Sequence, residues 1–383
     1  MSGMNVLMVG SDGNAVTEGS PLARRLTAYA AHLDTLHVLL LGRGRRGDDV
    51  TLPPNVFVHD LRSRLGLVSF LRGTGRARQL IKAHGIAVVS AQNPFEHGFI
   101  AMRAVRGTTA KLHLQVHTDY LSPWFTRGAI YRSPRVRMPL LNRIRIPLAH
   151  RVVIRADGIR AVSARIKESM LARYGARIPE PSVIPIPMSP EVPPKVSLPE
   201  RPFTFTLIAV SRLEPEKRLP DVLATVRRLH QVYPSLGVVI VGDGSERTHL
   251  EKLARTWGIE DRVLFLGWRP DAWGLIQDAN AFIQASAYEG YGATLIEAAL
   301  AGVPIVTSDV GVVGEVFVGY EHVFAAPVGD PTNLAALTAQ LIEDPQTRIL
   351  LSLEGKRAAL AHLAALKNTP ADIVADMLRT VSP

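Results

Sequence analysis

The chain has 383 residues, 47% of them apolar, and a formal net charge of +10 at neutral pH. This length predicts two domains of comparable size rather than one core, and the absence of cysteine excludes disulfides, thiolate metal sites and cysteine nucleophiles and favours a reducing, cytoplasmic compartment. No apolar run approaches the roughly 20 residues that span a bilayer, so we expect a soluble or peripheral protein.

Short apolar runs alternate with longer amphipathic segments in the first half of the chain. Such alternation is typical of β-α-β units and a parallel sheet. We assign residues 1–180 to an N-terminal Rossmann-like domain. Strands are predicted over Asn5–Gly10, His37–Leu41, Val56–His59, Ala87–Ala91 and Lys111–His117, and helices over Pro21–His32, Val68–Ala83 and Glu96–Val105.

The positive charge is concentrated in that half. Residues 1–190 hold 27 Lys+Arg against 11 Asp+Glu, a net +16, which leaves 17 against 23, a net −6, for residues 191–383. Between Arg127 and Arg177, arginines interleave with leucines and isoleucines. This pattern predicts peripheral contact with an anionic membrane, and a solvated arginine-rich face is the alternative. We rank nucleic acid below both, because no recognition motif accompanies the charge.

A proline-rich stretch separates the two halves. Nine prolines between residues 179 and 202 predict an extended linker, which we place at residues 181–202. A second Rossmann-like domain is predicted over residues 203–365. Its strands are Phe203–Val210, Gly237–Val241, Val263–Leu266, Ala281–Ala285 and Pro304–Thr307, and its helices are Pro220–Tyr233, Glu246–Trp257, Ala293–Ala301 and Leu334–Glu343. Residues 366–383 are expected to end in a short helix, Asp372–Val381, that packs on either domain, with a return to the N-terminal domain possible.

Ligands bind beyond the carboxyl ends of the strands in open parallel sheets. Gly290 and Gly292 directly follow a predicted strand and precede a predicted helix, so bare backbone amides there are able to hold a diphosphate. Glu297 lies one turn into that helix, where its carboxylate can accept hydrogen bonds from sugar or ribose hydroxyls. The alternative is that Glu289 belongs to an exposed loop and Glu297 to a solvated helix face.

Two cations follow the first strand of the second half. Arg212 can form a forked contact with phosphate oxygens, and Lys217 can add a point charge across the turn. Such cations would stabilise a departing diphosphate. Solvated surface charges are the alternative interpretation.

Two further strand ends carry weaker signals. Gly242 and Gly244 follow a predicted strand, but they lack the full three-glycine phosphate motif, so a tight turn is the favoured meaning. In the first half, the strand that begins at Lys111 ends at His117, which can orient or polarise a reacting centre or simply be a satisfied structural histidine.

Taken together, these motifs closely resemble the nucleotide-sugar domain of retaining family 4 glycosyltransferases. The resemblance rests on Ser211-Arg212-Leu with Lys217, on Val241-Gly-Asp-Gly244, and on Glu289 and Glu297 inside Tyr-Glu-Gly-Tyr-Gly-Ala-Thr-Leu-Ile-Glu, and it extends over roughly residues 203–345. It implies the GT-B fold, an α/β architecture of two Rossmann-like doubly wound domains facing a central cleft, with the N-terminal domain binding the acceptor.

The resemblance also implies residue roles. Arg212 and Lys217 would bind the donor diphosphate, Glu289 the donor sugar and Glu297 the ribose, and His117 would lie near the transferred sugar. The remaining donor-site positions are Gly19 and Ser20, in a loop that approaches the phosphates, Gly242 and Gly244, then Leu266, Gly267 and Trp268 near the base, and Gly290, Tyr291, Gly292, Ala293 and Thr294 around sugar and phosphate.

We therefore expect a retaining hexosyltransferase that moves a sugar from a UDP- or GDP-linked donor to a sugar, polysaccharide or lipid-linked acceptor at the inner face of the cell membrane. No Asp-x-Asp motif lies at a strand end, so no metal or other cofactor is expected. A nucleotide-sugar epimerase of the same architecture and a non-catalytic protein that binds anionic lipid or nucleic acid remain the alternatives.

Overall fold

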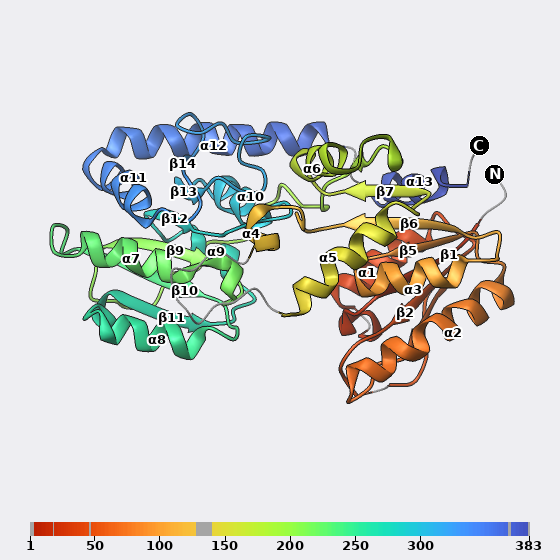
Figure 1. The fold of residues 1–383 in the computed structure, drawn as a ribbon. Coiled ribbons are helices and arrows are strands. Elements are labelled where there is room, and N and C mark those ends of the chain that lie inside the picture. The colour runs from red at the N-terminus through yellow and green to blue at the C-terminus, as the bar shows by residue number, and fades with distance from the viewer. Residues whose placement is uncertain (1–3, 18, 46, 128–139, 367–368, 382–383) are drawn as a thin grey trace. The chain divides into compact units, whose positions relative to one another are not determined.

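The computed structural model describes residues 4–17, 19–45, 47–127, 140–366 and 369–381. It divides the chain into two compact domains. The first comprises Met1–Leu121, Met138–Pro187 and Lys367–Pro383, and the second comprises Ser122–Arg137 and Met188–Leu366. Both are α/β domains with a largely parallel sheet (Figure 1).

The first domain contains an eight-stranded sheet in the order β3-β4-β2-β1-β5-β6-β7-β8. All strand pairs are parallel except β3 with β4. The central strands are almost wholly buried, because helices cover both faces and leave no room for polar alternation. The strands are β1 Asn5–Gly10, β2 Thr35–Leu40, β3 Val50–Leu52, β4 Val56–Asp60, β5 Val88–Ala91, β6 Lys111–Val116, β7 Gly158–Ala161 and β8 Ser182–Val183.

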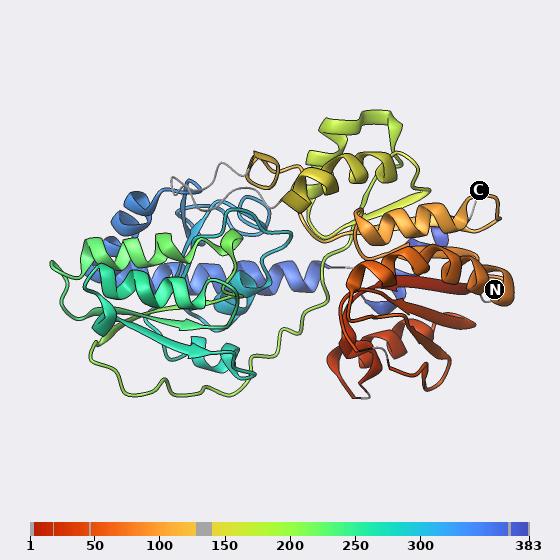
Figure 2. The same ribbon diagram turned by 60° about the horizontal axis from the view of Figure 1, so that its bottom comes forward.

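Two sets of helices cover this sheet. Helices α1 (Pro21–Ala30) and α13 (Pro370–Arg379) pack on one face, where Leu26, Tyr29 and Ile373 join the apolar core. Helices α2 (Gly66–His84), α3 (Glu96–Val105) and α5 (Leu140–Val153) pack side by side elsewhere on the same domain, and α6 (Ala164–Tyr174) follows β7. Figure 2 shows α13 in dark blue against the strands of this domain, although it lies at the far end of the sequence.

The second domain contains a six-stranded parallel sheet in the order β11-β10-β9-β12-β13-β14. Its core joins the strands to the amphipathic helices α7, α8 and α11. The strands are β9 Phe205–Val210, β10 Leu236–Val241, β11 Val263–Gly267, β12 Ala281–Gln284, β13 Ile305–Ser308 and β14 Phe324–Ala326, and the helices are α4 Pro123–Arg127, α7 Leu219–Leu229, α8 Arg247–Thr256, α9 Ala272–Ile276, α10 Ala293–Leu300, α11 Pro331–Glu343 and α12 Pro345–Ala365.

The predicted linker differs from the observed structure at both ends. Residues Ser182–Val183 form β8 against β7, so the start of the stretch belongs to the first domain. After Pro187 the chain runs without helix or strand until β9, but it is bound to the second domain: the amide of Val196 donates to the carbonyl of Gly274 at 3.1 Å and that of Leu198 to Asp278 at 3.0 Å. The prolines of this segment have no backbone N–H to donate, and the amides of Val196 and Leu198 hold it on the second domain.

The arginine-rich stretch predicted to face a membrane does not form one exposed surface. Arg160 is buried at 2% exposure in β7, and Arg145 pairs with Glu96 at 2.6 Å. Arg132, Arg135 and Arg137 lie outside the described residues. Arg160 therefore takes no part in an interfacial surface, because its side chain points into the domain, whereas membrane contact by the exposed Arg143, Arg151 and Arg155 stays a prediction. Across the described parts of the chain, no helix is long and apolar enough to cross a bilayer.

Candidate functional site

The loops after β9 and β12 are held together at the carboxyl edge of the second sheet. β9 and β12 are parallel neighbours, so both loops leave the sheet on the same side. The amide of Ala287, after β12, donates to the carbonyl of Glu216, after β9, at 2.7 Å. The two segments predicted to hold the donor, in which Lys217 and Glu289 are 72 residues apart, are thus adjacent in space.

Lys217 and Glu289 form an ion pair across these loops. Lys217 Nζ lies 2.6 Å from Glu289 Oε1, and the two side chains are only 16% and 12% exposed. The hydroxyl of Ser286 donates to the same carboxylate oxygen at 2.7 Å. The ammonium group keeps further N–H donors and the carboxylate keeps a second oxygen, so both can bind a ligand without separating.

Arg212 turns toward its own loop. Its guanidinium donates to Glu216 Oε1 at 2.8 Å, and its side chain is exposed. The structure therefore places Arg212 on the loop that carries Lys217, without contact between Arg212 and the Lys217–Glu289 pair. Sequence reasoning missed Glu216, although its spacing of four residues from Arg212 was a visible signal for such a pair.

Glu297 is a desolvated carboxylate in α10. The indole of Trp273 donates to its backbone carbonyl at 2.9 Å, whereas no hydrogen bond or ion pair to its carboxylate is found among the described residues. Burial raises the pKa of Glu297 to about 7. A half-buried acid without a partner is suited to accept hydrogen bonds from a ligand's hydroxyls.

The glycines after β10 allow the neighbouring loops to approach. A Cβ atom on Gly242 would lie 1.8 Å from the carbonyl oxygen of Ser211, and one on Gly244 would lie 2.5 Å from that of Leu213. The amide of Gly242 donates to the carbonyl of Gly267 at 2.8 Å. These glycines form the tight turn that was the favoured interpretation, and their contact with a donor stays a prediction. Leu266 is partly buried beside them and Trp268 is exposed.

The loop before α10 combines open backbone with side chains that are already engaged. Gly292 has φ +93°, which favours glycine, and it is the N-cap of α10, which begins at Ala293. The hydroxyl of Tyr291 pairs with His362 at 2.8 Å, and that of Thr294 donates to Gln284 at 3.1 Å. The carbonyl of Tyr291 also accepts from the amide of Val312 at 2.9 Å, so this loop is tied to the rest of the second domain by side chain and backbone. The side-chain amide nitrogen of Gln284 is buried without a partner.

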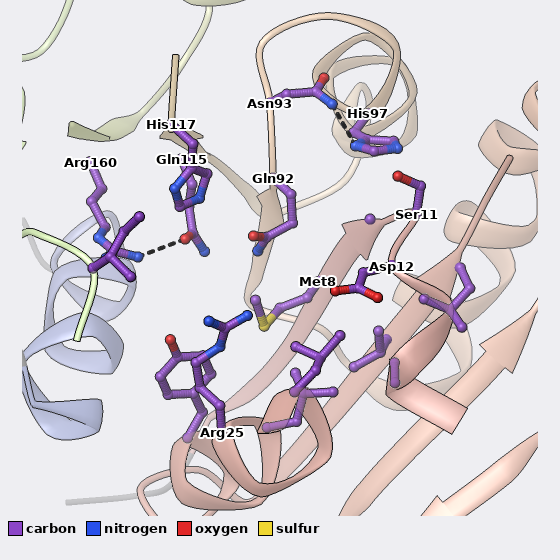
Figure 3. A pocket seen from close by; sticks show the side chains of 18 of the residues that line it. Met8, Ser11, Asp12, Arg25, Gln92, Asn93, His97, Gln115, His117 and Arg160 are labelled. Carbon is purple, nitrogen blue, oxygen red and sulfur yellow. Dashed lines mark hydrogen bonds between the residues drawn. The ribbon is translucent and has the colours of Figure 1, made fainter. Parts of the chain in front are cut away.

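The first domain contains a cavity of about 420 Å³ at the carboxyl ends of β1, β5 and β6 (Figure 3). His117 follows β6 and lines it with Gln92, which follows β5. The His117 Nε2 and the Gln92 side-chain nitrogen are both buried without a partner. Burial, and then the charges of Arg160 and Arg25, lower the pKa of His117 to about 3, so the imidazole is neutral at physiological pH.

This cavity is cationic. Arg25 lines it with no ion pair found among the described residues, and Asp12 is the carboxylate that faces it (Figure 3). The buried Arg160 donates to neutral oxygens: Gln115 Oε1 at 2.8 Å and the carbonyls of residues 184 and 185 at 2.9 Å each. Sequence reasoning missed Arg25, and it read Arg160 as a surface residue. The arrangement favours a ligand that carries negative charge and hydroxyls.

Arg160 also starts a chain of buried hydrogen bonds that ends in α13. Gln115 donates to the hydroxyl of Ser90 at 3.0 Å, and this hydroxyl contacts His113 Nδ1 at 3.1 Å. His113 Nε2 contacts Asp376 Oδ2 at 3.0 Å. A carboxylate only accepts, so His113 donates to Asp376. The cavity wall is thereby fixed to the last helix of the chain.

The predicted phosphate loop has a local structural role. Ser20 caps α1 by accepting from the amide of Ala23 at 3.0 Å, and it donates to the carbonyl of Asn14 at 2.7 Å. Gly19 adopts φ +73° and has open space where a Cβ would be. Neither residue lines the cavity that contains His117. Within the described residues, no group of three or more His, Asp or Glu side chains is placed to hold a metal ion.

Comparison with known proteins identifies the family of both domains. The chain matches Glycosyltransferase Family 4 over residues 22–191 and Glycosyl transferases group 1 over residues 194–357. A glycogen synthase from Mycobacterium tuberculosis is 30% identical over 197 residues, 51% of this chain and 47% of that protein. A lipopolysaccharide 1,6-galactosyltransferase from Salmonella typhimurium is 34% identical over 163 residues, 40% and 43% of the two chains. The matched segments thus span about half the length of these relatives.

Solved structures share the fold over the whole chain. Sucrose-phosphate synthase from Thermosynechococcus elongatus has a TM-score of 0.78 at 16% identity and covers 98% of both chains. Anabaena HepE in complex with UDP-glucose has a TM-score of 0.71 at 20% identity and covers 99% of both. The α/β fold of GT-B glycosyltransferases is therefore confirmed, and with two matched families covering residues 22–191 and 194–357, the chain belongs to the group 1, family 4 glycosyltransferases.

Proposed function

We propose that the chain is a retaining glycosyltransferase that uses a nucleotide diphosphate sugar as donor. The observation that carries this proposal is the Lys217–Glu289 pair, which places a cation and a hydroxyl-binding carboxylate side by side at the carboxyl edge of a parallel sheet. Glu297 supplies a second carboxylate in the helix that follows the Glu289 loop. The UDP-glucose complex of the HepE fold relative supports a donor of this class.

Sugar transfer from a nucleotide diphosphate requires groups that stabilise the negative charge of the leaving diphosphate more than it requires a general base. The acceptor oxygen bonds to the anomeric carbon as the bond from that carbon to the diphosphate oxygen breaks, and the hydroxyl proton passes to a diphosphate oxygen. Lys217 and Arg212 then balance the charge that develops on the leaving group. His117, neutral and with a free ring nitrogen, orients a sugar hydroxyl, and no metal is assigned a role.

The cationic cavity of the first domain is our candidate for the acceptor. Its volume of about 420 Å³ and its partly apolar lining are those of a small-ligand site. The buried nitrogens of Gln92 and His117 have no protein partner, and Arg25 adds a guanidinium to the lining. An acceptor sugar attached to a phosphorylated, membrane-held lipid would satisfy them, and a soluble anionic sugar would do so equally.

Thermal unfolding with a panel of UDP- and GDP-sugars tests the donor assignment. A donor at about 100 times its dissociation constant adds about 2.7 kcal/mol to the unfolding free energy. We expect one nucleotide class to raise the midpoint, and the Lys217→Ala variant to lose that shift. A panel without any stabilising member would contradict the proposal. Formation of an epimer from the donor alone would instead identify an epimerase.

Donor affinity should depend on pH through Glu297. With a pKa of about 7, this carboxylate is mostly ionised at pH 8 and mostly protonated at pH 6. The ionised form accepts two ribose hydrogen bonds, so the dissociation constant should rise about tenfold between pH 8 and pH 6. Calorimetric titration across this range checks it. The Glu297→Gln variant should bind more weakly with a flat pH profile, and an unchanged slope in that variant would remove Glu297 from the ribose site.

A further inference from the structure

Three large aliphatic side chains are exposed together at the start of α2. Leu65, Leu67 and Leu71 are 72%, 71% and 74% exposed. Leu67 and Leu71 are one helical turn apart, and Leu65 is the residue that precedes the helix. Single exposed leucines are ordinary, but three within seven residues form a small apolar patch that requires an explanation.

Arginines lie next to this patch. Arg43, Arg45, Arg64 and Arg72 are exposed, and no acidic partner for any of them is found among the described residues. The loops that carry these arginines contact each other and the start of α2. The amide of Gly44 donates to the carbonyl of Ser63 at 3.0 Å, and a Cβ on Gly66 would lie 3.2 Å from the backbone nitrogen of Arg43. We call this set, with the three leucines, the arginine–leucine surface.

The charge of this surface is poorly neutralised. A hollow of about 320 Å³ is lined by Arg45, Arg64 and Arg72 together with Arg62. Of these four, Arg62 is the one paired with a carboxylate, that of Asp60 at 2.7 Å. The 19 residues of α2 contain no acidic side chain. Guanidinium groups without carboxylates, next to exposed leucines, are complementary to a layer of phosphates over hydrocarbon.

We propose that the arginine–leucine surface docks the first domain on an anionic bilayer. Leu65, Leu67 and Leu71 enter the boundary between headgroups and acyl chains, and the surrounding arginines bind lipid phosphates. A second copy of the chain is disfavoured as occupant, because it would bring the same positive charge to the contact. The inference goes beyond the proposed transfer reaction and needs none of the donor-site residues.

The second domain offers a matched control. Leu350 and Leu353 of α12 are each 58% exposed. Nearby, Arg357 is neutralised by Glu354 at 2.9 Å, so this helix presents mixed charge to solvent. Substitutions on α12 therefore separate the effect of exposed leucines alone from that of exposed leucines next to unpaired arginines.

Co-sedimentation of the full chain with vesicles tests the proposal. We expect binding to phosphatidylcholine vesicles that contain about one third phosphatidylglycerol and little binding to pure phosphatidylcholine. The Leu67→Gln/Leu71→Gln variant should lower the partition coefficient about tenfold or more. The Arg64→Ala/Arg72→Ala variant should lower it about 25-fold, since each basic residue near the surface contributes about fivefold. Leu350→Gln/Leu353→Gln should bind like the unaltered chain.

Three results would overturn this inference. They are failure to bind anionic vesicles, an equal loss in the α12 control, and unchanged binding of the Leu67→Gln/Leu71→Gln variant. A change of oligomeric state in that variant without vesicles would assign the surface to a second copy instead. Thermal unfolding should show every variant folded, and stabilisation by a nucleotide sugar should be the same in all of them. A failure here is thus distinguishable from failure of the proposed transferase activity.

Discussion

Replacing Lys217 with alanine should reduce turnover by about 10²–10³-fold, the effect of removing one preorganised donor from a developing anion. The ammonium group lies 2.6 Å from Glu289, so its loss also frees the carboxylate that we assign to the donor sugar. Release of nucleoside diphosphate from the donor found in the thermal screen is the measurement. Lys217→Arg should retain part of the rate, because it keeps the charge but changes its geometry.

Lys252 provides the control for this experiment. It is an exposed lysine of α8 in the same domain, and Lys252→Ala changes net charge as Lys217→Ala does. We expect near-unaltered turnover from this control. Equal rates for the two alanine variants would show that Lys217 does not bind the leaving diphosphate, even if the protein still binds nucleotide sugars.

Asp376→Ala should lower the unfolding free energy by about 3–5 kcal/mol, the cost of removing one partner from a buried charged contact. The carboxylate of Asp376 accepts from His113 at 3.0 Å and from Arg379 at 2.6 Å, and the residue is buried. Its loss leaves His113 Nε2 without an acceptor between the sheet and α13. Chemical denaturation, followed by a probe in the first domain, measures the change.

Asp34→Ala is the comparison for stability, because Asp34 is exposed in the same domain and its replacement should change the unfolding free energy little.

The pH dependence of unfolding gives a second test of Asp376. Burial would raise the pKa of Asp376, but hydrogen bonding and charge from His113 outweigh it, so the pKa is lowered. The contribution is then present at neutral pH and lost as the pH falls through that lowered pKa, below about 3.9. A variant with an unchanged acid transition would contradict this role.

The strands that carry the proposed donor site were predictable from the sequence. Of these strands, β9 differs from its prediction by two residues and β12 by one, and in the first domain the predicted strand Asn5–Gly10 and helix Glu96–Val105 match the structure residue for residue. Glycine or polar residues flank these apolar runs, so the sequence indicates both whether each element is a strand or a helix and where it ends. The proximity of Lys217 and Glu289 followed from placing two motifs at the carboxyl ends of parallel strands.

Other features depend on tertiary contacts that no local pattern records. Helix α5 was missed because Pro147 lies inside it, and α12 because its apolar residues do not fall on one helical face. Arg160 was misread because a buried arginine and a solvated one look alike in sequence, and its acceptors come from residues 184 and 185 and from Gln115. Ser90, His113 and Gln115, polar residues inside apolar strands, were the available signal for the buried chain.

The return of α13 to the first domain has a consequence for biosynthesis. Residues 367–383 leave the ribosome after the whole of the second domain, yet Ile373, Val374 and Met377 belong to the core built on β1 and α1. The domain that starts to emerge first therefore finishes last. A released chain truncated after Leu366 should present a protease-resistant second domain beside a first domain that lacks α13 and is readily digested.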